Sequence, residues 1–346
     1  MCATPCPPPS PRVTVLLPTY NAEDFIDETL RSVFGQTFTD FEVLLLDNAS
    51  TDRTPHVVAG FSDPRLKVVR NPTNIGFAAN VQLGRDLATA PYVVVFNADD
   101  IWEPSFLART VAVLDANPKV TVVHCRIVLM DEQGRCYGDA VTDWPALCPG
   151  RQAFALSFVA GFSSPAMLMR NSVLRAVGTL PTDEAWIKVP DCWLLLQLCL
   201  RGDVAYIGEP LMRYRVHQSS LMSEIHLDGT FFRRQLATLR DAFNWPELAG
   251  SGIAGEFAKL SRHIALQAAV TLPTLRATQS RLRVAGAFAD IITEVPSILL
   301  NPTVWMRFAY SLLPRRTIDA LRAVRRRNWA LRNQGRAMLP TGGRQA

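Results

Sequence analysis

The sequence has few features of a secreted, disulfide-bonded or membrane-spanning protein. Its seven cysteines are odd in number, have no regular spacing and include no Cys-x-x-Cys pair, so they predict neither a disulfide framework nor a zinc site and fit a reducing compartment. Residues 1–11 are rich in proline and lack an apolar core, which indicates a disordered lead-in and not a signal peptide. No run reaches the roughly 18 apolar residues of a membrane span, and the nearest candidate, residues 295–313, is broken by Pro302 and Arg307. We therefore expect a cytoplasmic protein.

The glycine-rich loops of the common nucleotide-binding folds are also missing. Neither Gly-x-Gly-x-x-Gly nor Gly-x-x-x-x-Gly-Lys follows any expected strand, which argues against a Rossmann dinucleotide site and against a P-loop. Without a cradle of glycine amides, a metal ion becomes the more natural partner for bound phosphates.

Positive charge is concentrated at the C-terminal end of the chain. Residues 301–346 contain ten arginines, no lysine and one acidic residue, a surplus of +9, whereas the whole chain carries +5 and its first 300 residues therefore −4. Because the basic character belongs to the tail, we expect no nucleic-acid surface on the rest of the protein. A content of 48% apolar and 19% charged residues predicts a folded chain, and its 346 residues favour one large domain with an appendage.

Strand-like apolar runs alternate with helical periodicity over the first 120 residues. Strands are expected at 13–17, 41–46, 66–69 and 92–96, and the helices that follow them begin near Asn21, which would cap the first, and near Pro55, Asn74 and Pro104. This alternation predicts a largely parallel sheet with helices on both sides. Farther on we expect a strand at 120–130, a turn at 131–134, an irregular stretch to about 164, a strand and helix at 166–177, a helix at 192–200, a strand at 204–207, a polar loop at 212–221 and helices from about 224.

Polar residues follow each strand of the first half. They occupy 18–21, 47–48, 71–76 and 97–100, and because parallel strands end at one edge of a sheet, we expect them in a single crevice. Asp99 and Asp100 stand out, since paired carboxylates at such an edge can hold a divalent cation against a diphosphate. The alternative is that they only begin the turn before the next helix.

The chain from Val13 to about Leu221 resembles the inverting family 2 glycosyltransferases, which have the GT-A fold. The resembling motifs are VTVLLPTYN at 13–21, SVFGQTF at 32–38, FEVLLLDNASTD at 41–52, NIGF at 74–77 with Asn80, and NADDIWEP at 97–104. Five motifs in the family's order and spacing, over roughly 60% of the chain, make the resemblance specific. It implies an α/β GT-A catalytic domain at 12–222, divided into a nucleotide-binding half at 12–118 and an acceptor half at 119–222, and a helical C-terminal region with a basic tail at 223–346.

The resemblance also implies roles for individual residues. Contacts to the nucleotide sugar fall on Pro18, Thr19, Tyr20, Asp47, Asn74, Gly76, Asn97, Ala98 and Asp99. Their alternative roles are those of ordinary turn and cap positions. The segment PDCWL at 190–194, followed by Gly202, is similar to the family's acidic pair, tryptophan and glycine, so Asp191 is the expected catalytic base. The segment departs from the family in two ways: Pro190 replaces the Glu, and the tryptophan is displaced by one position. The alternative for Asp191 is a helix N-cap.

A divalent cation, Mg²⁺ or Mn²⁺, is the cofactor that the resemblance implies. The family's Asp-x-Asp motif begins here with Asn97, so Asp99 is the expected metal ligand, with Asp100 beside it as a second ligand or ribose contact. In the segment YRVH at 214–217, Arg215 would pair with the diphosphate and His217 would complete the metal shell. A solvated basic loop is the alternative for these two residues.

The predicted function is that of an inverting glycosyltransferase. It would move a sugar from a nucleoside-diphosphate sugar to a hydroxyl of a glycan or lipid-linked acceptor, as in cell-surface polysaccharide synthesis. UDP is the expected nucleotide, with dTDP and GDP left open. A non-catalytic sugar-nucleotide-binding or scaffold protein on the same fold is one alternative, and a nucleotidyltransferase, whose basic glycine-rich loop is missing here, is another.

The basic tail predicts peripheral contact with the inner face of a membrane. Residues 315–332 are dense in arginine, and Ile318, Leu321, Val324 and Leu331 fall on one side of a helix drawn through them. The alternative is a basic helix that packs on its own domain or is solvated.

Overall fold

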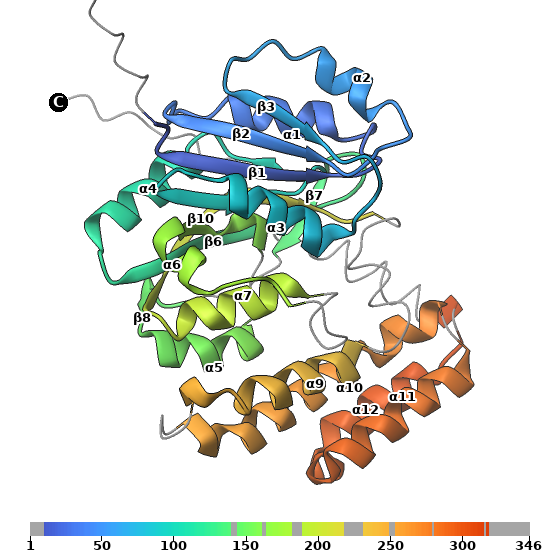
Figure 1. The fold of residues 1–346 in the computed structure, drawn as a ribbon. Helices are drawn as coiled ribbons and strands as arrows, with labels where there is room; N and C mark the ends of the chain where they lie inside the picture. Colours follow the sequence, from blue (N-terminus) through green and yellow to red (C-terminus); the bar gives the residue numbers. More distant parts are fainter. Residues whose placement is uncertain are drawn as a thin grey trace, which may run out of the picture. The chain divides into compact units, whose positions relative to one another are not determined.

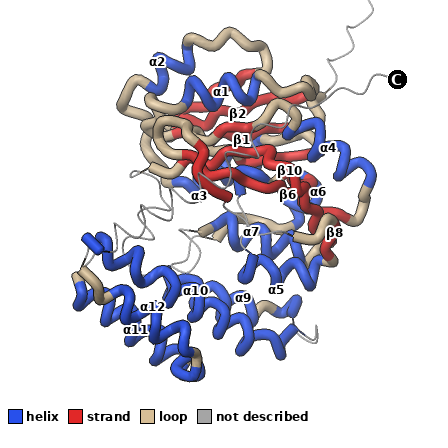
Figure 2. The backbone as a smooth tube through the Cα atoms, turned by 180° about the vertical axis from the view of Figure 1, so that it is seen from behind, coloured by secondary structure: helices blue, strands red, loops and turns tan. Residues whose placement is uncertain are grey.

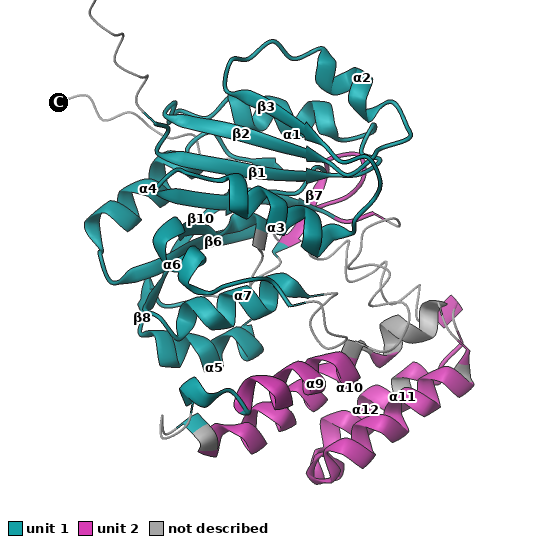
Figure 3. Ribbon diagram, in the orientation of Figure 1, with its two compact units in different colours: residues 1–128, 139–215, 244–253 teal, residues 129–138, 216–243, 254–346 magenta. Residues whose placement is uncertain are grey.

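The computed structural model describes residues 10–139, 144–160, 164–181, 189–217, 231–248, 253–278, 280–314 and 316–317. They fall into two compact units (Figure 3). Unit 1 comprises residues 1–128, 139–215 and 244–253, and unit 2 comprises residues 129–138, 216–243 and 254–346. Most of the expected lead-in, residues 1–9, and most of the arginine-rich tail, residues 318–346, lie outside the described residues.

A mixed sheet with the strand order β3-β2-β1-β4-β9-β6-β10-β5 runs through the chain, with β7 beside β6 and β8 beside β10 (Figure 1). The strands are β1 Val13–Thr19, β2 Phe41–Asp47, β3 Leu66–Arg70, β4 Tyr92–Val95, β5 Ile101–Trp102, β6 Val120–Met130, β7 Cys136–Asp139, β8 Leu147–Cys148, β9 Leu168–Arg170 and β10 Asp203–Arg215. The first four are parallel, as the sequence predicts. Beyond β4 the sheet changes character, because β9 is antiparallel to both β4 and β6, and β10 to both β5 and β8.

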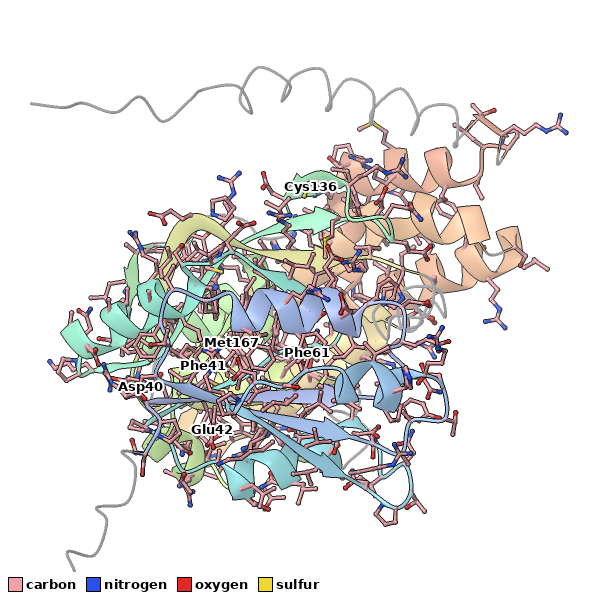
Figure 4. The ribbon with its side chains drawn as sticks, turned by 90° about the horizontal axis from the view of Figure 1, so that it is seen from above. Asp40, Phe41, Glu42, Phe61, Cys136 and Met167 are labelled. Atoms are coloured by element: carbon pink, nitrogen blue, oxygen red, sulfur yellow. The ribbon has the colours of Figure 1, made fainter. Side chains whose placement is uncertain are left out.

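Helices cover both faces of the parallel half. In unit 1 they are α1 Ile26–Phe34, α2 Thr54–Ala59, α3 Phe77–Leu87, α4 Phe106–Ala116, α5 Gly150–Ala160, α6 Asn171–Ala176 and α7 Pro190–Cys199. Figure 1 shows α3 in front of β1 and β2, and the reverse view in Figure 2 shows α1 on the other face. All residues of β1 and β2 are buried for this reason, including Phe41 at the start of β2, which is labelled in Figure 4.

The structure corrects four local predictions. Helix α1 begins at Ile26 after Phe25, so Asn21 is not its cap. Strand β1 continues through Pro18, which was expected to end it. Residues 212–215, expected in a loop, form the end of β10 and pair with β5. Helix α5 occupies part of the stretch that was expected to be irregular.

The start of α5 lies so close to α7 that it requires a glycine, which is why the sequence indicates a helix only weakly here. A Cβ atom on Gly150, its first residue, would lie 2.1 Å from the carbonyl oxygen of Cys199. The helix therefore begins with a glycine that its neighbour requires, and not with a residue of the usual capping type.

An aromatic stack anchors the loop that carries Asp99 and Asp100. The ring of Trp102 lies 3.9 Å from that of Phe96 and 4.4 Å from that of Phe106, measured between centroids. Its indole nitrogen donates a hydrogen bond to the carbonyl oxygen of Pro165 (3.1 Å). The loop is thus fixed on both sides by buried rings.

The described residues of unit 2 are mainly helical, in agreement with the predicted helical C-terminal region. The helices are α9 Phe231–Phe243, α10 Phe257–Thr278, α11 Arg281–Glu294, the 3-10 helix η4 Pro296–Leu300 and α12 Pro302–Ser311. Among the residues that the structure describes, no helix combines the length and the apolar character needed to cross a membrane.

Candidate functional site

The carboxyl ends of β1, β2 and β3 lie in register. Thr19 pairs with Asp47, and Asp47 pairs with Arg70. The backbone N–H of Asn48 donates to the carbonyl of Thr19 (2.8 Å), and that of Asn71 donates to the carbonyl of Asp47 (2.9 Å). The polar residues after these strands therefore start from one aligned edge, as the sequence predicts.

Asp47 is buried and its carboxylate is held at both oxygens. One oxygen accepts the backbone N–H of Ser50 (2.9 Å) and the other accepts Nη1 of Arg70 (2.6 Å). Arg70 also donates to the carbonyl of Ser50 (2.8 Å), which closes the turn in which Ala49 has φ +63°. Sequence reasoning missed Arg70; its only signal was its place at the end of the third strand.

A network of four asparagine amides shapes the loop before α3. Asn48 donates to Asn74 (2.8 Å), Asn71 donates to both Asn48 (3.0 Å) and Asn80 (2.9 Å), and Asn80 donates to the carbonyl of Leu46 (2.8 Å). Amides suit this purpose because each one both donates and accepts.

Gly76, and not Asn74, occupies the N-cap position of α3. Its φ of +83° lies in the region that favours glycine, and no side chain caps the helix. Asn74 instead accepts the backbone N–H of Gly76 (2.9 Å). Both residues are exposed, so the start of α3 lies at the surface of unit 1 at this edge.

The loop after β1 is tied to the turn after β2. Asn21, with φ +47°, accepts the backbone N–H of Thr51 (2.8 Å) and donates its own N–H to Ser50 Oγ (3.0 Å). Pro18 and Thr19 are buried inside the edge, whereas Tyr20 is 49% exposed. Of the residues predicted to contact the base, Tyr20 is therefore the one whose ring is presented to solvent.

Asp100 lies completely inside unit 1. Its carboxylate accepts the backbone N–H of Arg215 (2.9 Å) and the amide of Asn97 (3.1 Å), and its carbonyl accepts the hydroxyl of Thr29 (2.9 Å). Burial, and next the nearby charge of Asp99, raise the pKa of Asp100 well above its usual value. These contacts give Asp100 a role in fixing the shape of the loop at 97–100.

The side chain of Arg215 supports the same loop. It is 2% exposed, and its Nε donates to the carbonyl of Asp99 (2.8 Å) while Nη2 pairs with the carboxylate of Glu28 (2.6 Å). The guanidinium carbon lies 4.9 Å from the ring centroid of Phe25. Glu28 is 187 residues away in sequence and was missed, because no local pattern links it to Arg215.

The donor groups at 99 and 100 fit a divalent cation of the magnesium class. Within the described ranges, no three His, Cys, Asp or Glu side chains come close enough together to form a metal cluster. Mg²⁺ does not need one, since it commonly binds one or two carboxylates and completes its shell with water and substrate phosphates. Asp99 is half-buried beside Asp100, and a cation would relieve the repulsion between the two carboxylates. His217 belongs to unit 2, and its place in the metal shell stays a prediction.

Asp191 is the second residue of α7 and does not cap it. The cap position is Val189, without a side-chain hydrogen bond, so the N-cap alternative for Asp191 is wrong. A half-buried carboxylate in the first turn is stabilised by the free N–H groups of the helix. Gly202, the glycine of the same motif, is required by packing, because a Cβ atom there would lie 2.5 Å from the carbonyl oxygen of Lys119.

The sequence profile described as Glycosyl transferase family 2 matches residues 14–178. An uncharacterized glycosyltransferase of Haemophilus influenzae is 28% identical over 62% of this chain and 68% of its own length. The putative glycosyltransferase EpsE of Bacillus subtilis is 30% identical over 61% of this chain and 74% of its own length. A third relative, from Escherichia coli, is described as a UDP-Glc:alpha-D-GlcNAc-diphosphoundecaprenol beta-1,3-glucosyltransferase and is 31% identical over 30% of this chain and 42% of its own length.

Two solved structures share the GT-A architecture. TarS of S. aureus in complex with UDP aligns over 83% of this chain and 90% of its own, with a TM-score of 0.55 and 19% identity. The mannosyltransferase PcManGT of Pyrobaculum calidifontis, in complex with GDP-Man and Mn²⁺, aligns over 89% of this chain and 86% of its own, with a TM-score of 0.54 and 23% identity. At these identities the likeness concerns the fold.

Proposed function

The chain belongs to glycosyl transferase family 2 and is a glycosyltransferase, and on this premise we propose that it transfers a sugar from a nucleoside-diphosphate sugar to an acceptor hydroxyl with inversion at the anomeric carbon. The observation that carries the proposal is the loop at 97–100, which holds Asp99 beside a buried Asp100 at the edge of the parallel strands. Membership of an enzyme family argues against the scaffold and nucleotidyltransferase alternatives.

The donor would bind along the aligned strand ends. Tyr20 is exposed for contact with the base, with Pro18, Thr19 and Asp47 beneath it in the edge. Asn74 and Gly76 would meet the diphosphate at the start of α3, and Asn97, Ala98 and Asp99 would meet it from the opposite loop. UDP is the nucleotide we favour, because the E. coli relative is described with UDP-Glc and TarS was solved with UDP. The GDP-Man in PcManGT keeps GDP open.

Asp99 and Asp100 are the residues that would hold Mg²⁺ or Mn²⁺. Such an ion neutralises negative charge on the diphosphate as it leaves. Both carboxylate oxygens of Asp100 accept hydrogen bonds, one from the backbone of Arg215 and one from Asn97, and Asp100 is buried, so Asp99 is the more accessible ligand of the pair. Arg215, which pairs with Glu28 and donates to the carbonyl of Asp99, would contribute to binding the diphosphate by holding the loop at 97–100 in place.

Asp191 would act as the catalytic base. It takes the proton from the acceptor hydroxyl, whose oxygen attacks the anomeric carbon on the face opposite the diphosphate. The bond between that carbon and the phosphate oxygen breaks as the new glycosidic bond forms, so configuration inverts. The acceptor we propose is a glycan or lipid-linked sugar at the inner face of the membrane, as the diphosphoundecaprenol in the description of the E. coli relative suggests.

Nucleotide binding can be tested by thermal unfolding with UDP, dTDP, GDP and NAD, each with and without Mn²⁺. A ligand that binds only the folded protein stabilises it by about 2.7 kcal/mol at 100 times its Kd. We expect one nucleoside diphosphate, UDP, to raise the Tm only when Mn²⁺ is present, and Asp99→Ala to remove that rise.

Asp115→Ala is the matched control for Asp99→Ala. Asp115 accepts a hydrogen bond from Tyr92, the first residue of β4, at the end of the strand opposite to Asp99. This variant should keep the Mn²⁺-dependent rise. A Tm that no nucleotide changes, or an equal response in Asp99→Ala, would contradict the proposed donor site.

A further inference from the structure

Helix α12 belongs to unit 2 (Figure 3), and the exposed residues described on it are apolar. Its exposed positions are Pro302, Trp305, Met306 and Ala309, with Leu312 just after the helix. Their spacing of three, four, seven and ten residues from Pro302 places them on one face of the helix. Leu300, at the end of η4 and 83% exposed, leads into this face. We call these six residues the α12 stripe.

The opposite side of α12 is packed inside unit 2. Val304 and Ser311 are completely buried, and the ring of Phe308 stacks on that of Phe288 with centroids 3.9 Å apart. Trp305 at the border also touches Phe288 and donates its indole N–H to the carbonyl of Leu299 (3.0 Å). The stripe therefore lies on a helix that is packed inside its own unit on the opposite side, and it exposes apolar side chains.

The large apolar side chains of the stripe are strongly exposed. Met306 is 64% exposed and Trp305 is 47% exposed. Folding usually hides such side chains, and an exposed contiguous group of them marks a surface that meets another apolar medium.

The charges that follow the stripe in the sequence indicate which apolar medium it meets. Between Val295 and Pro314 the one charged residue is Arg307, and the 32 residues that follow contain nine arginines and one acid. An apolar face bearing Trp, followed in the sequence by a segment rich in arginine, matches the interface of an anionic bilayer, where apolar groups enter the headgroup boundary and cations meet lipid phosphates. A second copy of the chain is a poorer match, because pairing the stripes would bring two segments with a surplus of +9 together.

We propose that the α12 stripe docks on the surface of an anionic lipid bilayer, with Leu300, Trp305 and Met306 as the side chains that enter it. This deepens the proposed function and rests on it in one respect, the lipid-linked class of acceptor. The apolar contact comes from a folded helix of unit 2, and the arginines that follow it add electrostatic attraction.

Flotation of the full chain with lipid vesicles tests the proposal. The vesicles are phosphatidylcholine alone or phosphatidylcholine with phosphatidylglycerol, and the test variant is Leu300→Glu/Met306→Glu. Both substitutions replace exposed side chains, so the fold should tolerate them. The control Leu87→Glu/Val159→Glu adds the same two carboxylates at exposed apolar positions of α3 and α5, 45% and 40% exposed.

We expect the wild type and the control to float with phosphatidylglycerol vesicles, and the test variant to partition at least about tenfold less. Raising the salt concentration should weaken wild-type binding, because it screens the arginines. Equal flotation of test and control variants would overturn the proposal. So would a wild type that binds no vesicle but forms a dimer that the test variant loses, because the stripe would then be a contact between copies.

Nucleotide-dependent thermal shifts on the same variants separate this inference from the proposed function. The test variant should keep the wild-type response to nucleotide and Mn²⁺. If the wild type floats but no nucleotide changes its Tm, the docking surface is supported and the donor site is contradicted. If a nucleotide raises the Tm but the wild type does not float, the donor site is supported and the docking surface is contradicted.

Discussion

At the residue scale, two neighbouring carboxylates have different environments. Asp100 is completely buried and accepts hydrogen bonds from Asn97 and from the backbone of Arg215. Asp99, one residue earlier, is half-buried, and its carbonyl accepts a hydrogen bond from Arg215. The sequence shows that two carboxylates are adjacent. Which of them is buried and hydrogen-bonded depends on the fold.

Asp191→Asn should separate donor binding from turnover. Asparagine keeps the size of the side chain but cannot accept the acceptor proton, so we expect turnover to fall by about 10²–10⁴-fold with an unchanged nucleotide-dependent Tm. Release of the nucleoside diphosphate measures turnover. Asp115→Asn, at the opposite end of the sheet, is the control and should keep its rate. Wild-type turnover in Asp191→Asn would refute the assignment of the base.

His124 predicts a pH dependence of stability. It is 1% exposed on β6, its ring packs 4.6 Å from that of Trp144 and 4.9 Å from that of Tyr206, and burial lowers its pKa to about 3. The neutral imidazole is therefore favoured in the folded state. Its contribution is complete above the unfolded pKa of about 6.5 and is lost as the pH falls from there toward 3, by up to about 1.4 kcal/mol per pH unit.

Urea unfolding at several pH values between 7 and 5 measures this loss. In His124→Phe, which keeps an aromatic ring but cannot be protonated, the free energy of unfolding should fall less steeply over this range than in the wild type. Parallel pH profiles of the two proteins would show that His124 is not the group responsible.

At the scale of elements, the end of β10 supports the loop at 97–100. Arg215 is the last residue of the strand, and its backbone and guanidinium hold Asp100 and Asp99 while Glu28 of α1 neutralises it. The sequence predicted a polar loop here, because two arginines and a histidine occur within five residues, at 213, 215 and 217. The strand forms because the side chains at 211 and 212 are buried and because Arg213 and Met212 pair with β5.

Arg215→Met should destabilise the protein far more than Arg213→Met, a matched change in the same strand. Arg215 is 2% exposed, and its loss removes the donor to the carbonyl of Asp99 and the cation that pairs with Glu28, at a cost of about 2–3 kcal/mol. Arg213 pairs with Glu103 at 41% and 31% exposure, so its removal should cost at most about 1 kcal/mol. Urea unfolding of the two variants gives both values. Equal losses would show that Arg215 does not support the loop in this way.

The course of β1 shows why a local rule failed at Pro18. Proline has no N–H and was therefore expected to end the strand. Leu16 faces β4, since its carbonyl accepts the N–H of Phe96, and Pro18, two residues later, faces the same side. The pairing of β1 with β4 ends at Leu16 and Val95, so the missing donor of Pro18 would have had no partner there.

At the scale of the whole molecule, charge and exposed apolar surface gather in the same part of the chain. The first 300 residues carry −4, and the last 46 carry +9. The described residues of that basic end include all of the α12 stripe except Leu300. In unit 1 the apolar residues of the parallel strands belong to one core, and exposed apolar side chains such as Leu87 and Val159 lie on different helices.

Sequence alone determined the alternation of strands and helices through α4, the parallel order of the first strands and the family, because these depend on short-range periodicity and on motifs with fixed spacing. The candidate site residues Asn97–Asp100 and Asp191 were predicted from motifs of the same kind. Only the tertiary structure decided which groups pair across long separations, such as Glu28 with Arg215 and Asn48 with Asn80 through Asn71. It also decided which apolar residues remain uncovered, as along α12, because burial depends on neighbours that no local pattern specifies.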